Sequence, residues 1–179
     1  VVTPVSSNSA LERCESFDVV IRTRIGSPYV IEGMSHPSAQ NTELVVGYEA
    51  NGGFLLGSQV LRNGQRLGPL PTRDAVLPIV ALLCCAKEQG LQVSALLDNL
   101  PQRFTASDRI QNTPTANSIA LLVALKEDSV LAKDLLAPQS GGVVQMDEID
   151  GLRVYFSSGD VTVGIVKTEL VILTSSEVM

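Results

Sequence analysis

A short stretch of small and turn-forming residues divides the chain into two unlike parts. Leu136 to Gly142 contains a proline and a Gly-Gly pair and shows no hydrophobic periodicity, which is typical of a linker. Before it, apolar runs suited to strands alternate with helical patterns, whereas after it short β-rich runs are separated by turn residues. We therefore predict an α/β domain with a layered mixed sheet at 1–133, a linker at 134–142 and a small β-rich segment at 143–179.

The first part carries clear strand and helix signals. Gly52-Gly53 separates two apolar runs and predicts two strands joined by a tight loop. Asp74 supplies a cap for the apolar run at 75–86, which we expect to be a buried helix that ends before Gly90. The same patterns predict a strand at 17–23 and helices at 29–34, 91–97 and 118–126, with a polar stretch at 101–117 between the last two helices.

The charge of the chain argues against nucleic acid and membranes as partners. Only 18% of the 179 residues are charged, the net charge is -6, and the basic residues are scattered. No basic patch is therefore present to attract a phosphate backbone or anionic lipid. The longest apolar run is shorter than the roughly 20 residues that cross a bilayer. No secretory signal is visible, so we expect a cytoplasmic protein.

Few residues could support nucleophilic or metal chemistry. His36 is the single histidine, and no G-x-S-x-G turn presents a serine, so we do not expect a Ser-His-Asp hydrolase. Cys84 and Cys85 lie inside an apolar run and Cys14 stands alone. This spacing predicts neither a disulfide nor a metal site.

Two motifs follow each other at a fixed spacing. The first runs from Arg22 to Met34 and begins Arg-Thr-Arg-Ile-Gly-Ser-Pro-Tyr, and the second runs from Val46 to Phe54 and contains Gly-Tyr-Glu-Ala-Asn-Gly-Gly. Together they resemble domain three of the α-D-phosphohexomutases of the phosphomannomutase and phosphoglucomutase type. Segments at 70–75 and 107–109 fall where that domain continues, and 150–154 resembles the opening of domain four. The resemblance covers about residues 1–160.

The resemblance implies a sugar-binding loop at residues 47–52, which in the family usually reads Gly-Glu-x-Ser-Gly. Glu49 keeps the glutamate, Asn51 replaces the serine, and Gly47 and Gly52 would let the backbone approach the ligand. A carboxylate accepts hydrogen bonds from two adjacent hydroxyls, and an amide both donates and accepts, which suits a pyranose ring. Considered without the family, the same residues form an exposed turn between two strands.

The resemblance also implies roles for two arginines. Arg24 would face the active-site cleft and add positive charge near the phosphoserine, as an auxiliary catalytic candidate, and Arg22 is the second candidate for substrate binding. The alternative for both is a surface arginine beside a strand. Ser27-Pro28 stands where relatives often carry a basic residue, and we assign Pro28 no function.

The groups that carry out the family's phosphoryl transfer are not found in this sequence. Relatives use a phosphoserine in a Thr-Ala-Ser-His-Asn-Pro loop and a Mg²⁺ held by an Asp-x-Asp-x-Asp-Arg loop. Ser35-His36-Pro37 is the nearest match to the first but lacks its threonine, alanine and asparagine. We therefore expect no catalytic residue and no metal site in this chain, with Mg²⁺ bound elsewhere in the parent enzyme. After Asp160 the Ser-Gly phosphate loop of domain four is also missing.

The sequence leaves two functions open. In the first, the chain is part of a phosphohexomutase that interconverts hexose 6-phosphate and hexose 1-phosphate. This part would recognise the sugar, depend on the missing N-terminal mutase domains and be inactive alone. In the second, it is a non-catalytic module, a pseudoenzyme or relic that binds sugar phosphates or another protein. An uncovered interdomain surface would also permit a homo-oligomer.

Overall fold

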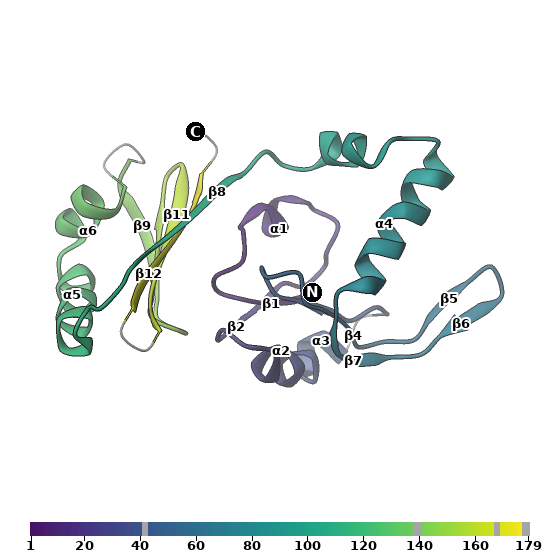
Figure 1. Ribbon diagram of the computed structural model, residues 1–179, viewed down its shortest axis with the longest axis horizontal. Coiled ribbons are helices and arrows are strands. Elements are labelled where there is room, and N and C mark those ends of the chain that lie inside the picture. Colours follow the sequence, from purple (N-terminus) through teal and green to yellow (C-terminus); the bar gives the residue numbers. More distant parts are fainter. Residues whose placement is uncertain (41–42, 138–140, 167–168, 177–179) are drawn as a thin grey trace. The chain divides into compact units, whose positions relative to one another are not determined.

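The computed structural model describes residues 1–40, 43–137, 141–166 and 169–176. The chain forms two compact units, Val1–Pro101 and Gln102–Met179 (Figure 1). Each unit has its own five-stranded sheet and its own cluster of buried hydrophobic residues. The mixed α/β class predicted from the sequence is confirmed.

The first unit is built on a mixed sheet. Its strands are β1 (Val2–Pro4), β2 (Ile21–Thr23), β3 (Val46–Tyr48), β4 (Phe54–Leu56) and β7 (Leu70–Asp74). The order in the sheet is β2-β1-β3-β4-β7, with β1 parallel to β2 and β3 and the other pairs antiparallel. Between β4 and β7 the chain forms a separate hairpin from β5 (Val60–Arg62) and β6 (Gln65–Leu67).

One helix, α2 (Ser27–Met34), packs against β1 and β3, and the core of this unit lies between the helix and the sheet. Gly26 precedes the helix and Pro28 occupies its first turn, where a missing N–H leaves no hydrogen bond unmade. The buried residues of this core are Val2, Val30, Met34, Ala39, Val45 and Leu55. The other helices of the unit are α1 (Ala10–Arg13), α3 (Pro37–Gln40), α4 (Val76–Gln89) and the 3-10 helix η1 (Val93–Asn99).

Helix α4 begins and ends where the sequence predicts. The Asp74 carboxylate accepts hydrogen bonds from the backbone N–H groups of Val76 and Leu77 at 2.8 and 2.6 Å. Gly90 ends the helix with a left-handed φ of 66°. The expectation that this helix is buried is wrong, because Ala86 is its one buried residue. Apolar residues occur all round α4, so one packing face cannot cover them.

The second unit is an antiparallel sheet in the order β8-β12-β11-β10-β9. Its strands are β8 (Phe104–Ile110), β9 (Val143–Asp147), β10 (Leu152–Phe156), β11 (Gly159–Val166) and β12 (Glu169–Ser176). The last four form the meander that the turn residues predict. Two helices, α5 (Thr115–Glu127) and α6 (Ser129–Leu136), stand between β8 and β9 in the chain.

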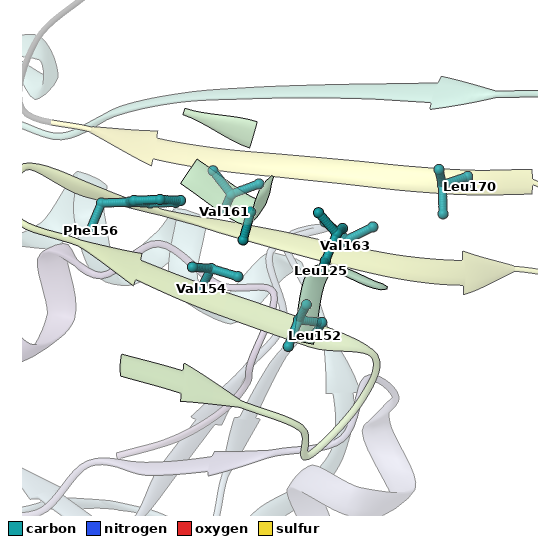
Figure 2. Packing of buried hydrophobic residues seen from close by; sticks show 8 residues of the cluster. Leu125, Leu152, Val154, Phe156, Val161, Val163 and Leu170 are labelled. Atoms are coloured by element: carbon teal, nitrogen blue, oxygen red, sulfur yellow. The ribbon is translucent and has the colours of Figure 1, made fainter. Parts of the chain in front are cut away.

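Side chains from the sheet of the second unit and from both of its helices share one core (Figure 2). Its members are Leu125, Ala132, Leu152, Val154, Phe156, Val161, Val163 and Leu170. Because Leu125 belongs to α5 and Ala132 to α6, both helices are part of the second unit.

The compact units therefore divide at Pro101 and Gln102, whereas composition predicts a boundary at 134–142. The predicted linker joins α6 to β9 inside the second unit, and its residues 138–140 lie outside the described part of the chain. Strand β8 lies within the polar stretch 101–117, and all of its residues are exposed. A strand without a buried face needs no alternation of apolar and polar residues, so the sequence does not reveal it. Among the helices described, none has the length and apolarity of a transmembrane span.

Candidate functional site

The loop between β3 and β4 is closed by its own hydrogen bonds. The N–H of Glu49 donates to the carbonyl of Gly53 at 2.8 Å, and the N–H of Gly52 donates to the carbonyl of Glu49 at 3.0 Å. Oδ1 of Asn51 accepts from the N–H of Gly53 at 3.0 Å, as in an Asx turn. Gly52 has a φ of 88°, a conformation that glycine adopts without strain. These contacts fix the backbone that carries the predicted ligand-binding side chains.

Glu49 is largely buried, with 6% of the residue exposed. Its Oε2 accepts a hydrogen bond from Oγ of Ser27 at 2.5 Å, and Nε of Arg73 lies 3.8 Å from the same oxygen. Ser27 is the first residue of α2, so the carboxylate also lies near the positive end of the helix dipole. Glu49 therefore differs from the exposed turn residue that the sequence alone predicts.

Arg73 approaches Glu49 across Gly53. Arg73 lies in β7, and Gly53 directly precedes β4, the neighbouring strand of the sheet. A Cβ atom on Gly53 would lie 2.6 Å from Nε and 2.8 Å from Cγ of Arg73. The missing side chain of Gly53 thus leaves the space that Arg73 occupies. The Arg73 side chain is 53% exposed, so solvent screens its charge.

The three other predicted site residues of the loop, Gly47, Asn51 and Gly52, have different environments. Asn51 and Gly52 are exposed, and while Oδ1 of Asn51 accepts a hydrogen bond within the loop, its amide nitrogen is a donor that can serve a ligand. Gly47 instead lies buried in β3. A Cβ there would lie 2.5 Å from Cγ1 of Val30 and 2.8 Å from Sδ of Met34. Gly47 therefore allows α2 to pack closely on the sheet.

Arg22 is used inside the first unit. Its Nε and one terminal nitrogen each donate to the Glu12 carboxylate at 2.8 Å. The terminal nitrogens also donate to the carbonyls of Pro4, Ser7 and Asn8 at 3.0, 2.9 and 3.1 Å. Its side chain is 10% exposed. These bonds hold the turn after β1 to β2.

Arg24 has a different environment from Arg22. Arg24 is exposed, and its guanidinium carbon lies 5.7 Å from the ring centroid of Tyr29. This cation–π contact holds the side chain along α2. The sequence-based role of Arg24 near a phosphoserine stays a prediction.

Sequence reasoning did not assign two residues that contact Glu49. In the sequence Ser27 stands where relatives often carry a basic residue, and Arg73 belongs to the matching segment 70–75, and neither position by itself indicates a role. The approach of Arg73 to Gly53 depends on the antiparallel pairing of β4 with β7, which no local pattern in the sequence shows. The contact of Ser27 with Glu49 joins residues 22 positions apart and leaves no local pattern.

The second unit contains a buried ionic cluster that the sequence did not reveal. Asp160 accepts from a terminal nitrogen of Arg153 at 2.9 Å and from one of Arg103 at 3.1 Å. The three side chains are 6%, 1% and 3% exposed, respectively. Arg153 also lies 4.9 Å from the ring centroid of Tyr155. The cluster ties β10 and β11 to the segment just before β8. Asp160 is thus a buried structural group.

Two surface cavities in the first unit are lined by residues outside the loop at 47–52. One, of about 330 Å³, is lined by Arg13, Cys14 and Asp98 among others, and the second, of about 310 Å³, by Phe17, Asp18 and Glu43 among others. Neither includes Glu49. Across the described residues, no three His, Cys, Asp or Glu side chains are grouped to hold a metal ion.

Comparison with known proteins relates this arrangement to one family. A family model described as phosphoglucomutase/phosphomannomutase, alpha/beta/alpha domain III, matches residues 1–104, which end close to the boundary of the first unit. A phosphomannomutase of Sinorhizobium fredii (strain NBRC 101917 / NGR234) is 41% identical over 159 residues, covering 89% of this chain and 33% of the relative. A phosphomannomutase of Salmonella muenchen is 38% identical over 161 residues, covering 90% of this chain and 33% of the relative.

The fold agrees with that relationship. A phosphoglucomutase/phosphomannomutase family protein of Burkholderia thailandensis aligns with a TM-score of 0.67 at 18% identity, over 99% of this chain and 33% of that chain. The present chain thus spans about a third of the length of the relatives it matches. It belongs to the phosphoglucomutase/phosphomannomutase family of phosphohexomutases and contains domain three of that family.

Proposed function

We propose that the chain is the sugar-recognising part of a phosphomannomutase-type enzyme that interconverts hexose 6-phosphate and hexose 1-phosphate. The observation that supports this is the fixed Glu49 carboxylate in the loop that the family uses for the sugar. Ser27 and Arg73 both contact Oε2. Oε1 is then the oxygen that can accept hydrogen bonds from ring hydroxyls.

Asn51 would supply the second contact to the sugar. Its amide nitrogen is a donor, so it can bind a hydroxyl oxygen whose proton is donated elsewhere. A carboxylate and an amide two residues apart can therefore bind neighbouring hydroxyls of one pyranose ring. Glu49 and Asn51 would thus distinguish sugars by the positions of their ring hydroxyls and would take part in no bond-breaking step.

The chemistry of phosphoryl transfer would come from outside this chain. The described residues offer no carboxylate group that fits Mg²⁺, so we place the metal and the phosphoserine in the missing N-terminal mutase domains. The chain alone should then be inactive. We propose that the complete enzyme acts on a hexose phosphate in the cytoplasm. We propose no nucleic-acid or membrane partner. The enzyme could also form a homo-oligomer.

The second candidate is a non-catalytic sugar-phosphate-binding module. The observation behind it is that neither the phosphoserine motif nor the aspartate motif described above is found among these 179 residues. Both candidates use the same loop and the same Glu49. They differ in whether the first unit supports turnover when the other domains are present.

A chimera tests the proposal. Residues 1–101 would replace the aligned segment of the Sinorhizobium fredii phosphomannomutase, and turnover of mannose 6-phosphate would be assayed with Mg²⁺. We expect an active chimera that loses about a hundredfold in kcat/KM on Glu49→Gln, because substrate-positioning contacts are worth about that much. Glu43→Gln, the same change at an exposed glutamate outside the loop, is the control that should keep activity. Equal activity of the Glu49→Gln chimera would overturn the assignment.

A further inference from the structure

The Glu49 carboxylate is held through one of its two oxygens. Oγ of Ser27 donates to Oε2 at 2.5 Å, and Nε of Arg73 lies 3.8 Å from that oxygen. We propose that Ser27 and Arg73 are positioning residues that fix Oε2, so that Oε1 is presented to the hydroxyls of a hexose phosphate. This inference rests on the proposed function of the loop and assigns roles to two residues outside it.

The three groups come from separate elements that the fold holds together. Ser27 begins α2, which packs against β1 and β3, while Arg73 lies in β7 beside β4. Glu49 follows β3 and its N–H is bonded across the loop to Gly53. A side chain anchored from a helix and from a strand can adopt few rotamers, which is the condition for a precise ligand contact.

The two contacts contribute unequally. The Ser27 hydrogen bond is short and its acceptor is a carboxylate oxygen, and such bonds are among the stronger ones in proteins. Arg73 is too distant for a hydrogen bond and is half exposed, so its attraction is screened. Ser27 should therefore fix the position of Oε2 of Glu49. Arg73 should favour the rotamer in which the carboxylate lies near β7.

Gly53 provides an independent way to move Arg73. A Cβ atom at Gly53 would overlap the middle of the Arg73 side chain, at 2.6 Å from Nε and 3.0 Å from Cδ. Gly53→Ala should displace Arg73 while both the charge and the Asn51 turn are kept, because the Gly53 N–H remains. Gly68→Ala is the matched control, since no atom lies within 4 Å of a Cβ at Gly68.

The test uses the full 179-residue chain labelled with ¹⁵N, with mannose 1-phosphate as the probe. Binding is measured from amide shifts for wild type and for Glu49→Gln, Ser27→Ala, Arg73→Gln, Arg73→Lys and Gly53→Ala. Arg66→Gln is the control for loss of a positive charge, because Arg66 is exposed in the separate hairpin. A second readout, free of ligand, is hydrogen exchange at Nε of Arg73 in wild type and in Glu49→Gln.

We expect Ser27→Ala to weaken binding by about tenfold, as loss of a hydrogen bond to a charged group does. Arg73→Gln and Gly53→Ala should weaken it by about threefold, and Arg73→Lys should stay near wild type because the positive charge remains. Both controls should match wild type. Exchange at Nε of Arg73 should be faster in Glu49→Gln, because the nearby negative charge that repels hydroxide, the catalyst of exchange, is removed.

Two results separate this inference from the proposed function. If Glu49→Gln abolishes binding while Ser27→Ala and Arg73→Gln bind as wild type does, the loop binds sugar and the positioning roles are wrong. If wild type binds nothing, or Glu49→Gln binds equally well, sugar recognition by the loop is wrong. The exchange measurement then decides the positioning contact by itself, and unchanged exchange in Glu49→Gln overturns it.

Discussion

Gly47 in β3 and Val30 in α2 lie so close that a side chain on the glycine cannot be accommodated without movement. A Cβ atom on Gly47 would stand 2.5 Å from Cγ1 of Val30. The same helix carries Ser27 at its first residue, so the packing of α2 on β3 also determines where the hydroxyl meets Glu49. Core packing and the candidate site are thus coupled through one short helix.

Gly47→Ala should destabilise the first unit by about 1–3 kcal/mol, because it overpacks a closed helix–sheet contact. Urea unfolding followed by circular dichroism measures the change. Gly68→Ala, which adds a methyl group in open space, should leave the unfolding midpoint unchanged. Equal midpoints for Gly47→Ala and wild type would show that the glycine is not needed for packing.

Arg22 and Arg24 should differ in their effect on stability. Arg22→Met removes hydrogen bonds to Glu12 and to three backbone carbonyls, and we expect a loss of about 2–3 kcal/mol. Arg24→Met removes one exposed cation–π contact and should change stability by less than about 1 kcal/mol. Thermal unfolding of the two variants side by side checks this, and similar losses would argue against a structural role specific to Arg22.

Asp160→Asn should destabilise the second unit strongly. The substitution takes the shared negative charge from between Arg103 and Arg153, which are nearly fully buried. Breaking a buried ion pair by removing one partner typically costs about 3–5 kcal/mol. Asp134→Asn on the exposed side of α6 makes the same chemical change as a control. A midpoint for Asp160→Asn within error of that control would contradict the importance of the cluster.

Asp128 caps α6 and should be replaceable by asparagine but not by alanine. Its Oδ1 accepts from the N–H groups of Val130 and Leu131 at 2.9 and 3.0 Å. Asp128→Ala should lower the free energy of unfolding by about 1 kcal/mol, whereas Asp128→Asn keeps the acceptor and should lose much less. Urea denaturation of both variants measures the difference, and the reverse order would rule out capping.

Substitutions at Glu49 and Asn51 should differ in their effect on stability, although both residues are proposed to bind sugar. Glu49→Ala removes a largely buried carboxylate and leaves the partly buried Ser27 hydroxyl without its acceptor, and we expect a loss of about 1–3 kcal/mol. Asn51→Ala loses one local hydrogen bond at an exposed position and should cost less than about 1 kcal/mol. Thermal melts check this pair, and an unaffected Glu49→Ala would mean that the Ser27 contact contributes little.

Elements set by local signals were predictable from the sequence. Gly52-Gly53 marks the turn between β3 and β4, and Asp74 with Gly90 marks the ends of α4. In each case the residue acts on its own backbone, through a left-handed φ or a cap, so its effect can be read from neighbouring positions. The turn residues of the C-terminal meander act in the same way.

Features that depend on distant residues were not predictable. β8 is an exposed edge strand without alternation, and its partner β12 lies far along the chain. The hydrogen bonds of Arg22 to Glu12 and to the turn after β1 join residues that the order of the strands brings together. The same is true of the contacts of Ser27 and Arg73 with Glu49. None of these contacts can be predicted before the sheet order is known. For the same reason the sequence could place Glu49 in a loop but could not show that its carboxylate is buried.

Glu49 is the residue that we propose recognises a hexose phosphate. The most direct measurement is titration of mannose 1-phosphate into the ¹⁵N-labelled chain and its Glu49→Gln variant, following the amides of Gly52 and Gly53. We predict saturable shifts in wild type and at least about tenfold weaker binding in the variant, because the carboxylate would lose charge-assisted hydrogen bonds. Identical titrations of the two proteins, or shifts that inorganic phosphate alone reproduces, would contradict the claim.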